Sequence, residues 1–166
     1  MELKLKTLKL KSPVLMAPMS GVTDFPFRSV VARFGTNLTF CEMLASREIL
    51  ASTRRAQATI LRHSLSSPFA VQLAGRDPVN MRAAAQFSEQ LGADIIDINM
   101  GCPAKKVVGG LAGSALMRDL KLAQKLIQTV VSAVQVPVTL KMRTGWDAST
   151  RNAPELAKIA ADLGVQ

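Results

Sequence analysis

Short apolar runs alternate with helix-like segments along the whole chain, and this order constrains the fold more than any other feature of the sequence. Apolar and β-branched residues predict five buried strands, at residues 14–17, 38–41, 69–73, 137–142 and in a run that stops at 101–103. Capping residues and first-turn prolines predict helices at residues 24–35, 45–61, 77–91, 119–130 and 152–164. Strands and helices that alternate in this way form parallel βα units.

The regular repetition of these units favours an α/β fold of the (β/α)8 TIM barrel type over a doubly wound sheet. Such a barrel needs about 250 residues, whereas this chain has 166. We therefore expect residues 1–166 to supply about the first five βα units, as the N-terminal part of one longer barrel domain. A hydrophobic content of 48% is sufficient for its core.

Leucine and lysine alternate between Leu3 and Lys11, which is typical of a half-exposed strand or hairpin and lacks the continuous apolar core of a signal peptide. We interpret this segment as a lid ahead of the main fold. No apolar run reaches the roughly 20 residues that cross a bilayer, so the sequence predicts a cytoplasmic protein without a membrane segment. Cys41 and Cys102 show no paired spacing, which argues against a disulfide framework or a metal site.

The chain carries a formal net charge of +9, from 21 Lys and Arg against 12 Asp and Glu. This charge favours a polyanionic partner, with nucleic acid as the leading candidate. Aromatic residues make up only 4%, which argues against a stacking platform for single strands. The alternative is a basic surface that only keeps the protein in solution.

Polar residues gather where the predicted strands end. In a barrel, the carboxyl ends of all strands meet at one face, and barrel enzymes place their chemistry there. The residues that this face would collect are 18–20, Glu42, Gln72, 99–102 and 141–143. The sequence therefore predicts a candidate active site at this face.

The run from Asp97 to Pro103 places an amide and a thiol at the end of a buried strand. Pro103 cannot donate to a sheet and restricts Cys102 to an extended turn, so we expect the thiol to face a cleft. Asn99 would orient a planar ring there, and the Cys102 thiol would exchange a proton with it, because a free thiol is still protonated near neutral pH. The alternative is that Cys102 packs as a small hydrophobic residue. A nucleophilic role is less favoured, because the one histidine, His63, is expected at the surface without a link to Cys102.

Two further polar residues follow apolar residues in predicted strands. Gln72 follows the run 69–71, and its buried amide needs partners, either a heterocyclic ligand or a neighbouring strand. Lys141 follows the run 138–140 on a predicted central strand, where an unpaired ammonium would be costly. Its partner would be Glu42, in a salt bridge, or an electron-rich cofactor.

Residues 105–114 contain Lys105, Lys106 and several glycines, which predicts a flexible loop that grips phosphate groups. The Walker spacing of a phosphate-binding loop is missing, so a nucleoside triphosphate site is not expected. Flexibility without any ligand is the alternative.

Four segments together resemble the tRNA-dihydrouridine synthases, and most closely the bacterial B-type branch that includes the nitrogen-regulation-like proteins. They are Met16–Asp24 with Pro26–Arg28, Gln72–Gly75, Asp97–Val107 and Lys141–Trp146. Other flavin barrels, such as dihydroorotate and dihydropyrimidine dehydrogenases, share the Asn-to-Cys strand end. They are not expected to carry the Lys105-Lys106 segment or the run 143–146.

The resemblance implies an FMN-binding barrel followed by a small helical tRNA-binding domain, with NADPH, or NADH, as the reductant. It implies that Cys102 protonates C5 of a uridine after hydride passes from the flavin to C6. Cofactor contacts are implied for Pro18, Met19, Ser20, Gln72 and Lys141, and substrate contacts for Asn99, Lys105, Lys106 and Arg143.

The partner implied by the resemblance is tRNA, and the target uridine would leave its stack to reach the active site. We expect the full-length enzyme to be a monomer that binds no metal. Residues 1–166 alone would bind FMN weakly or not at all and be inactive, because the family binds the FMN phosphate in later strands. Two other functions stay open here: a flavin oxidoreductase of free pyrimidines, and an RNA-binding fragment without catalysis.

Overall fold

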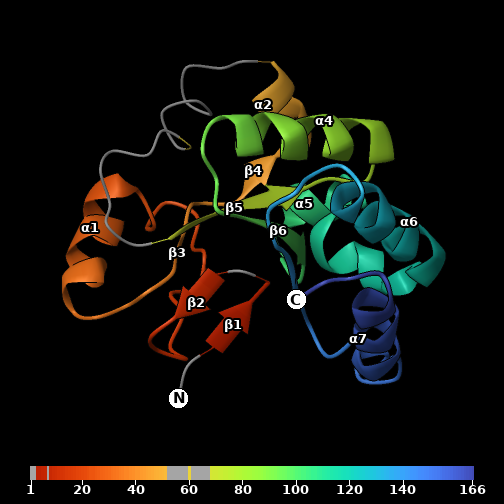
Figure 1. Ribbon diagram of the computed structural model, residues 1–166. Helices are drawn as coiled ribbons and strands as arrows, with labels where there is room; N and C mark the ends of the chain where they lie inside the picture. Colours follow the sequence, from red (N-terminus) through yellow and green to blue (C-terminus); the bar gives the residue numbers. More distant parts are fainter. Residues whose placement is uncertain (1–2, 7, 52–59, 61–67) are drawn as a thin grey trace.

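The main element of the fold is a parallel β-sheet, as the alternating sequence pattern predicts. The computed structural model describes residues 3–6, 8–51, 60 and 68–166. Strands β3 (Thr39–Phe40), β5 (Phe69–Ala74), β6 (Ile95–Met100) and β7 (Val138–Met142) lie in that order, and β4 (Leu44–Ala45) pairs with β5 further along. All pairings in this sheet are parallel (Figure 1). The carboxyl ends of the strands therefore meet at one edge.

The helices begin where the sequence predicts them. They are α1 (Phe25–Arg33), α2 (Ser46–Leu50), α4 (Pro78–Gln90), α6 (Leu120–Val131) and α7 (Ala153–Asp162). The carboxylates of Asp24, Asp77 and Asp119 cap α1, α4 and α6, each accepting a hydrogen bond from a first-turn N–H. Of the helix predicted at 45–61, α2 is seen, and residues 52–59 and 61–67 lie outside the described residues.

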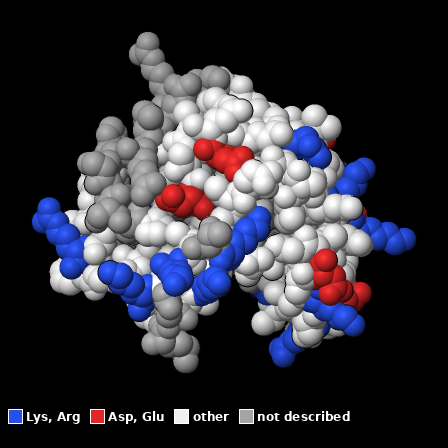
Figure 2. All heavy atoms as spheres, in the orientation of Figure 1, with Lys and Arg blue, Asp and Glu red and all other residues white. Residues whose placement is uncertain are grey.

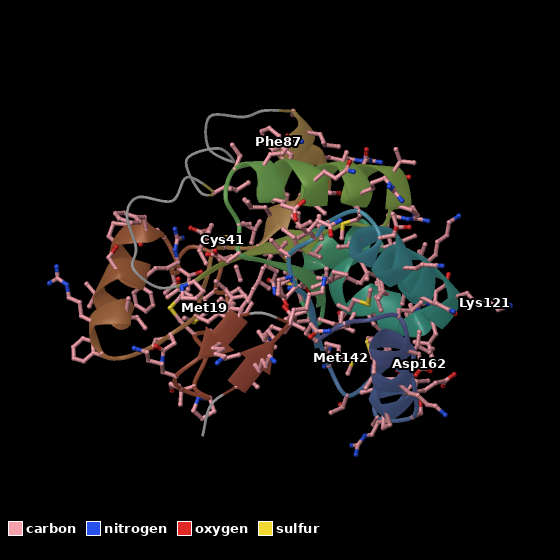
Figure 3. The ribbon with its side chains drawn as sticks, in the orientation of Figure 1. Met19, Cys41, Phe87, Lys121, Met142 and Asp162 are labelled. Atoms are coloured by element: carbon pink, nitrogen blue, oxygen red, sulfur yellow. The ribbon has the colours of Figure 1, made fainter. Side chains whose placement is uncertain are left out.

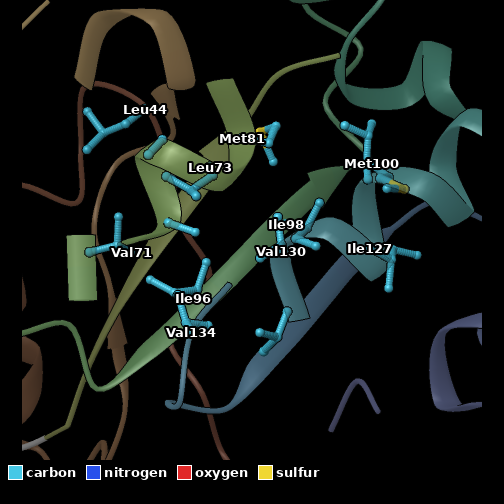
Figure 4. Close-up of a cluster of buried hydrophobic side chains, with 14 of the residues drawn as sticks. Leu44, Val71, Leu73, Met81, Ile96, Ile98, Met100, Ile127, Val130 and Val134 are labelled. Carbon is cyan, nitrogen blue, oxygen red and sulfur yellow. The ribbon is translucent and has the colours of Figure 1, made fainter. Parts of the chain in front are cut away.

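The two faces of the sheet have different neighbours. On one face, alternate side chains of β5 and β6 pack against α4 and α6 in the main apolar core (Figure 4). These side chains are Val71, Leu73, Ile96, Ile98 and Met100. The opposite, inner face carries the side chains between them and holds the predicted site.

A hairpin covers the amino-terminal end of the inner face. Strands β1 (Leu3–Leu5) and β2 (Leu8–Leu10) pair in antiparallel fashion, which confirms the predicted hairpin. Leu5 and Leu10 are buried in a second apolar cluster with Leu38, Phe40, Ala70 and Ile95. Ala70 and Ile95 lie at the starts of β5 and β6, so the hairpin closes the end of the sheet opposite to the predicted site. Its interpretation as a lid is therefore wrong.

Residues 14–17, predicted as the first buried strand, do not form one. Val14 is 65% exposed, and the segment joins the sheet through a single backbone hydrogen bond from Met16 N to Leu38 O, at 3.4 Å. The apolar run alone does not make a strand, because a strand also needs a continuous ladder of backbone hydrogen bonds.

Residues 105–114, predicted as a flexible loop, are largely helical. The short helix α5 (Lys105–Gly109) is followed by a 3-10 helix, η1 (Gly113–Arg118), in which residues 113–117 are buried. Gly113 packs closely against Cys102, whereas Gly109 and Gly110 are exposed. Because most of the segment is helical, the prediction of a mobile loop is wrong. In the described part of the chain, no helix has the length and apolar character needed to span a membrane.

Candidate functional site

A cavity of about 960 Å³ lies at the carboxyl ends of the parallel strands. Seven of the predicted site residues line it: Pro18, Ser20, Gln72, Asn99, Cys102, Lys106 and Lys141. The cavity is within the size range of pockets that hold cofactors and small molecules. The structure thus brings together residues that are up to 123 positions apart in the sequence, from Pro18 to Lys141.

A network of hydrogen-bonded polar side chains on the inner face reaches the cavity through Gln72 and Asn99. Gln72, Asp97 and Thr139 lie side by side on β5, β6 and β7. Gln72 Nε2 donates to Asp97 Oδ2 at 2.6 Å, and Thr139 Oγ1 donates to Asp97 Oδ1 at 2.6 Å. Asn99 Nδ2 donates to Gln72 Oε1 at 2.9 Å. Neighbouring strands therefore give the Gln72 amide one acceptor, for its nitrogen, and one donor, for its oxygen, as the alternative to a heterocyclic ligand predicts.

Asn99 holds the turn that carries Cys102. Its Oδ1 accepts hydrogen bonds from the N–H groups of Gly101, at 3.1 Å, and Cys102, at 2.9 Å. The Cys102 carbonyl accepts from Ser114 N–H at 3.0 Å. Gly113, with φ of +61°, leaves room here, because a Cβ on it would lie 2.7 Å from that carbonyl oxygen. Cys102 is thus fixed on both sides while it stays half-buried in the cavity wall.

Asp97 is a member of the network that the sequence did not indicate as a site residue. It is only 2% exposed, and burial raises its pKa, while its bonds to Thr139 and Gln72 and the charge of Lys141 act in the opposite direction. The signal in the sequence was a carboxylate between isoleucines in a buried strand, where an unpaired charge is costly.

Lys141 lines the cavity and is exposed, so it is not the buried ammonium that the sequence predicts. Its strand, β7, is the last one in the order of the described sheet. Glu42 instead accepts a hydrogen bond from Gly21 N–H, at 2.9 Å. It thereby ties the loop that contains Pro18 and Ser20 to the end of β3, and the ammonium of Lys141 faces the cavity.

Three predicted site residues lie outside the cavity lining: Met19, Lys105 and Arg143. Met19, labelled in Figure 3, is 39% exposed, and its backbone forms hydrogen bonds with Thr23. Lys105 and Arg143 are exposed. His63 lies outside the described residues.

The two cysteines have opposite environments. Cys41 is fully buried in the helix-facing core, and burial raises the pKa of its thiol to about 12. Its Sγ donates to the carbonyl of Glu42. Both thiols are free, and only Cys102 lines the cavity.

Basic residues are distributed over the surface. Figure 2 shows Lys and Arg side chains in a row across the lower part of one face and along its right side, with acidic side chains in the middle and at the lower right. The lysines of the β1–β2 hairpin, Lys4, Lys6 and Lys9, are all exposed, as are Lys105 and Lys106 beside the cavity. The positive charge therefore extends to the cavity rim.

Comparison with known proteins gives the same family that the sequence motifs resemble. A family model described as dihydrouridine synthase (Dus) matches residues 15–166. A probable tRNA-dihydrouridine synthase of Rickettsia prowazekii is 53% identical over 165 residues, which cover 99% of this chain and 50% of that protein. A probable tRNA-dihydrouridine synthase of Rhodobacter capsulatus is 52% identical over 170 residues, which cover 100% of this chain and 52% of that protein.

A tRNA-dihydrouridine synthase B of Vibrio vulnificus is 46% identical over 164 residues, 99% of this chain and 51% of that protein. The chain thus spans about half the length of the curated relatives that it matches. Because the family model covers far more than half of the chain, and the parallel βα units agree with a TIM barrel, the chain belongs to the dihydrouridine synthase family.

Proposed function

We propose that this chain is the N-terminal part of the catalytic domain of an enzyme that reduces uridines in tRNA to 5,6-dihydrouridine. FMN would be the cofactor and NADPH, or NADH, the reductant. The observation that carries the proposal is the Cys102 thiol, half-buried in a cavity at the strand ends and held by Asn99. The enzyme would act in the cytoplasm as a monomer with tRNA as its partner.

The donor groups of the cavity fit a flavin ring, whose edge presents carbonyl oxygens and ring nitrogens. Lys141 offers a cation to this edge. The Gln72 amide donates one of its two hydrogens to Asp97 and has a second for a ligand. We propose that Gln72 and Lys141 hold the polar edge of the ring, and that Pro18 and Ser20, with Met19 between them, contact its face.

Reduction of the uracil C5=C6 bond needs a hydride at one carbon and a proton at the other. When bound, the reduced flavin supplies the hydride, to C6. Cys102 donates its thiol proton to C5 and recovers a proton from solvent afterwards. A thiol is suited to this step because it is protonated near neutral pH yet acidic enough to release the proton.

Substrate contacts come from residues around Cys102. Asn99 has one amide hydrogen beyond its bond to Gln72, and we propose that it binds the uracil edge. Lys106 at the cavity, with Lys105 and Arg143 outside it, would bind the phosphates beside the target base. The base has to leave its stack to enter the cavity, which suits a loop uridine in folded tRNA.

The test is the Cys102→Ala variant of the intact protein, compared with Cys41→Ala, whose thiol lies outside the cavity. We expect Cys102→Ala to lower dihydrouridine formation in tRNA by at least about a hundredfold, the lower end of what a proton donor contributes. Dihydrouridine is measured by mass spectrometry of the nucleosides, and the flavin absorbance spectrum checks that FMN stays bound. Normal turnover in Cys102→Ala would remove Cys102 from this role.

The same assay separates the other two functions. A flavin oxidoreductase of free pyrimidines would reduce uracil without tRNA, whereas the proposed enzyme requires tRNA and loses activity as salt screens the basic surface. An RNA-binding protein without catalysis would form no dihydrouridine at all.

A further inference from the structure

We propose that Asp97 is a positioning residue that fixes the Cys102 turn through a one-way chain of hydrogen bonds. The chain runs from the Asp97 carboxylate through the side-chain amides of Gln72 and Asn99 to the backbone of Gly101 and Cys102. The proposal rests on the proposed function in so far as Cys102 is the proton donor. The hydrogen-bond chain itself is testable without that assumption.

The direction of the chain is set at its Cys102 end. The N–H groups of Gly101 and Cys102 can only donate, so they require the Asn99 oxygen. This orientation turns the Asn99 NH2 group toward Gln72, whose oxygen accepts at 2.9 Å. The Gln72 NH2 group then faces Asp97, and a carboxylate is the side chain that accepts there without offering a donor.

The chain leaves no alternative arrangement once the acceptor at position 97 is lost. The Gln72 NH2 hydrogen that points to Asp97, in a residue only 1% exposed, would then be buried without an acceptor. Turning the Gln72 amide over would place two NH2 groups against each other at Asn99. Turning Asn99 as well would place its NH2 group against the N–H groups of Gly101 and Cys102. Loss of the acceptor therefore loosens the Cys102 turn, although the hydrogen bonds of Asp97 go to Gln72 and Thr139 and not to Cys102.

Thr139 completes the environment of Asp97. Its hydroxyl donates to the other carboxylate oxygen at 2.6 Å, so both oxygens of Asp97 have a partner. An asparagine at position 97 could keep the chain, because its oxygen would accept from Gln72 while its NH2 group donates to the Thr139 hydroxyl. The proposal thus requires an acceptor at this position and not a charge.

The experiment compares Asp97→Leu and Asp97→Asn in the intact, flavin-loaded protein. The first readout is hydrogen exchange at the Gly101 and Cys102 amides, measured by mass spectrometry. The second is kcat and KM for tRNA. In Asp97→Leu we expect the Gly101 and Cys102 amides to exchange about tenfold faster and kcat to fall about tenfold, because one buried hydrogen bond is lost. We expect KM to stay within about twofold of the wild-type value. In Asp97→Asn we expect exchange and kcat to stay within about threefold of wild type.

The control is Ser88→Ala, which removes a buried hydroxyl that donates to Ala84 O far from this chain, and which we expect to leave both readouts unchanged. If Asp97→Leu does not fold, Asp97→Ser replaces it, because serine is too short to reach Gln72, and the same changes are expected. Unchanged exchange at Gly101 and Cys102 in these variants overturns the proposal, whatever happens to kcat. Equal damage in Asp97→Asn overturns it too, because charge would then matter and not the acceptor. If Cys102→Ala stays active, the proposed function fails, and the exchange result still decides on the hydrogen-bond chain.

Discussion

The two faces of the central strands are almost equally buried, yet they are built in opposite ways. On the helix-facing side of β6, Ile96, Ile98 and Met100 are 0–1% exposed and pack against apolar side chains. On the inner side of the same strand, Asp97 and Asn99 are 2% and 6% exposed and are held by hydrogen bonds. The difference therefore lies in what each side chain pairs with, and not in its access to solvent.

The helix-facing side of the strands stabilises the fold, whereas the inner side carries the polar groups of the candidate site. Apolar burial stabilises the fold without regard to direction, whereas a buried polar group is tolerated only where its hydrogen bonds are made. An inner face filled with isoleucine would be the simpler way to a stable sheet. Polar side chains at the strand ends are thus a feature of the site, and the helix-facing side supplies the rigid support for it.

The largest expected effect on stability is on the helix-facing side. Ile98→Ala is expected to lower the free energy of unfolding by about 3 kcal/mol, because it removes buried methyl groups and leaves a cavity. Cys102→Ala, at the half-exposed cavity wall, is expected to change it by less than about 1 kcal/mol. Urea unfolding of the intact protein measures both. A larger loss in Cys102→Ala than in Ile98→Ala would contradict the division between the faces.

The next expected effect is a pH dependence of the folding stability that comes from the buried Cys41 thiol. Burial raises the pKa of Cys41 from 9.0 to about 12, so above pH 9 the thiol ionises in the unfolded chain before it does in the folded one. The stability that depends on the protonated Cys41 is therefore complete below pH 9 and is lost, by about 1.4 kcal/mol per pH unit, between pH 9 and about 12. The stability difference between wild type and Cys41→Ala should shrink accordingly as the pH rises. A constant difference from about pH 8 to about pH 10.5, measured by denaturant unfolding, would show that Cys41 is not buried as described.

The smallest effect concerns backbone strain at the cavity rim. Leu111 has φ of +55°, a left-handed conformation that is costly for a residue with a Cβ, and it lines the cavity. Leu111→Gly is expected to raise the melting temperature slightly, by an amount that corresponds to at most about 1 kcal/mol. Leu111→Ala keeps the Cβ and should bring no gain. Equal effects of the two substitutions would show that the strain is absent.

Much of the fold follows from local signals. Asp24, Asp77 and Asp119 begin helices because a carboxylate accepts hydrogen bonds from the free N–H groups of a first turn, whatever surrounds it. The failures lie where the surroundings decide. An apolar run at 14–17 is a strand only if a neighbour completes its ladder, and glycines at 109–113 can serve flexibility or close packing equally well.

The candidate site shows the same division. Parallel strands bring their carboxyl ends together, so Gln72, Asn99, Cys102 and Lys141 could be predicted to meet from the sequence. The partners of these groups could not. A buried amide has several ways to pair its hydrogens, and only the register of β5, β6 and β7 places Asp97 beside Gln72 and Thr139.

The sequence by itself determined the βα order, the helix starts and the position of the thiol at a strand end, because these depend on neighbours within a few residues. Only the tertiary structure decided that the hairpin closes the far end of the sheet, that Lys141 is exposed, and that Asn99 holds the Cys102 turn. These outcomes depend on strand register and burial, which bring distant residues within hydrogen-bond distance. Such contacts leave no local pattern in the chain.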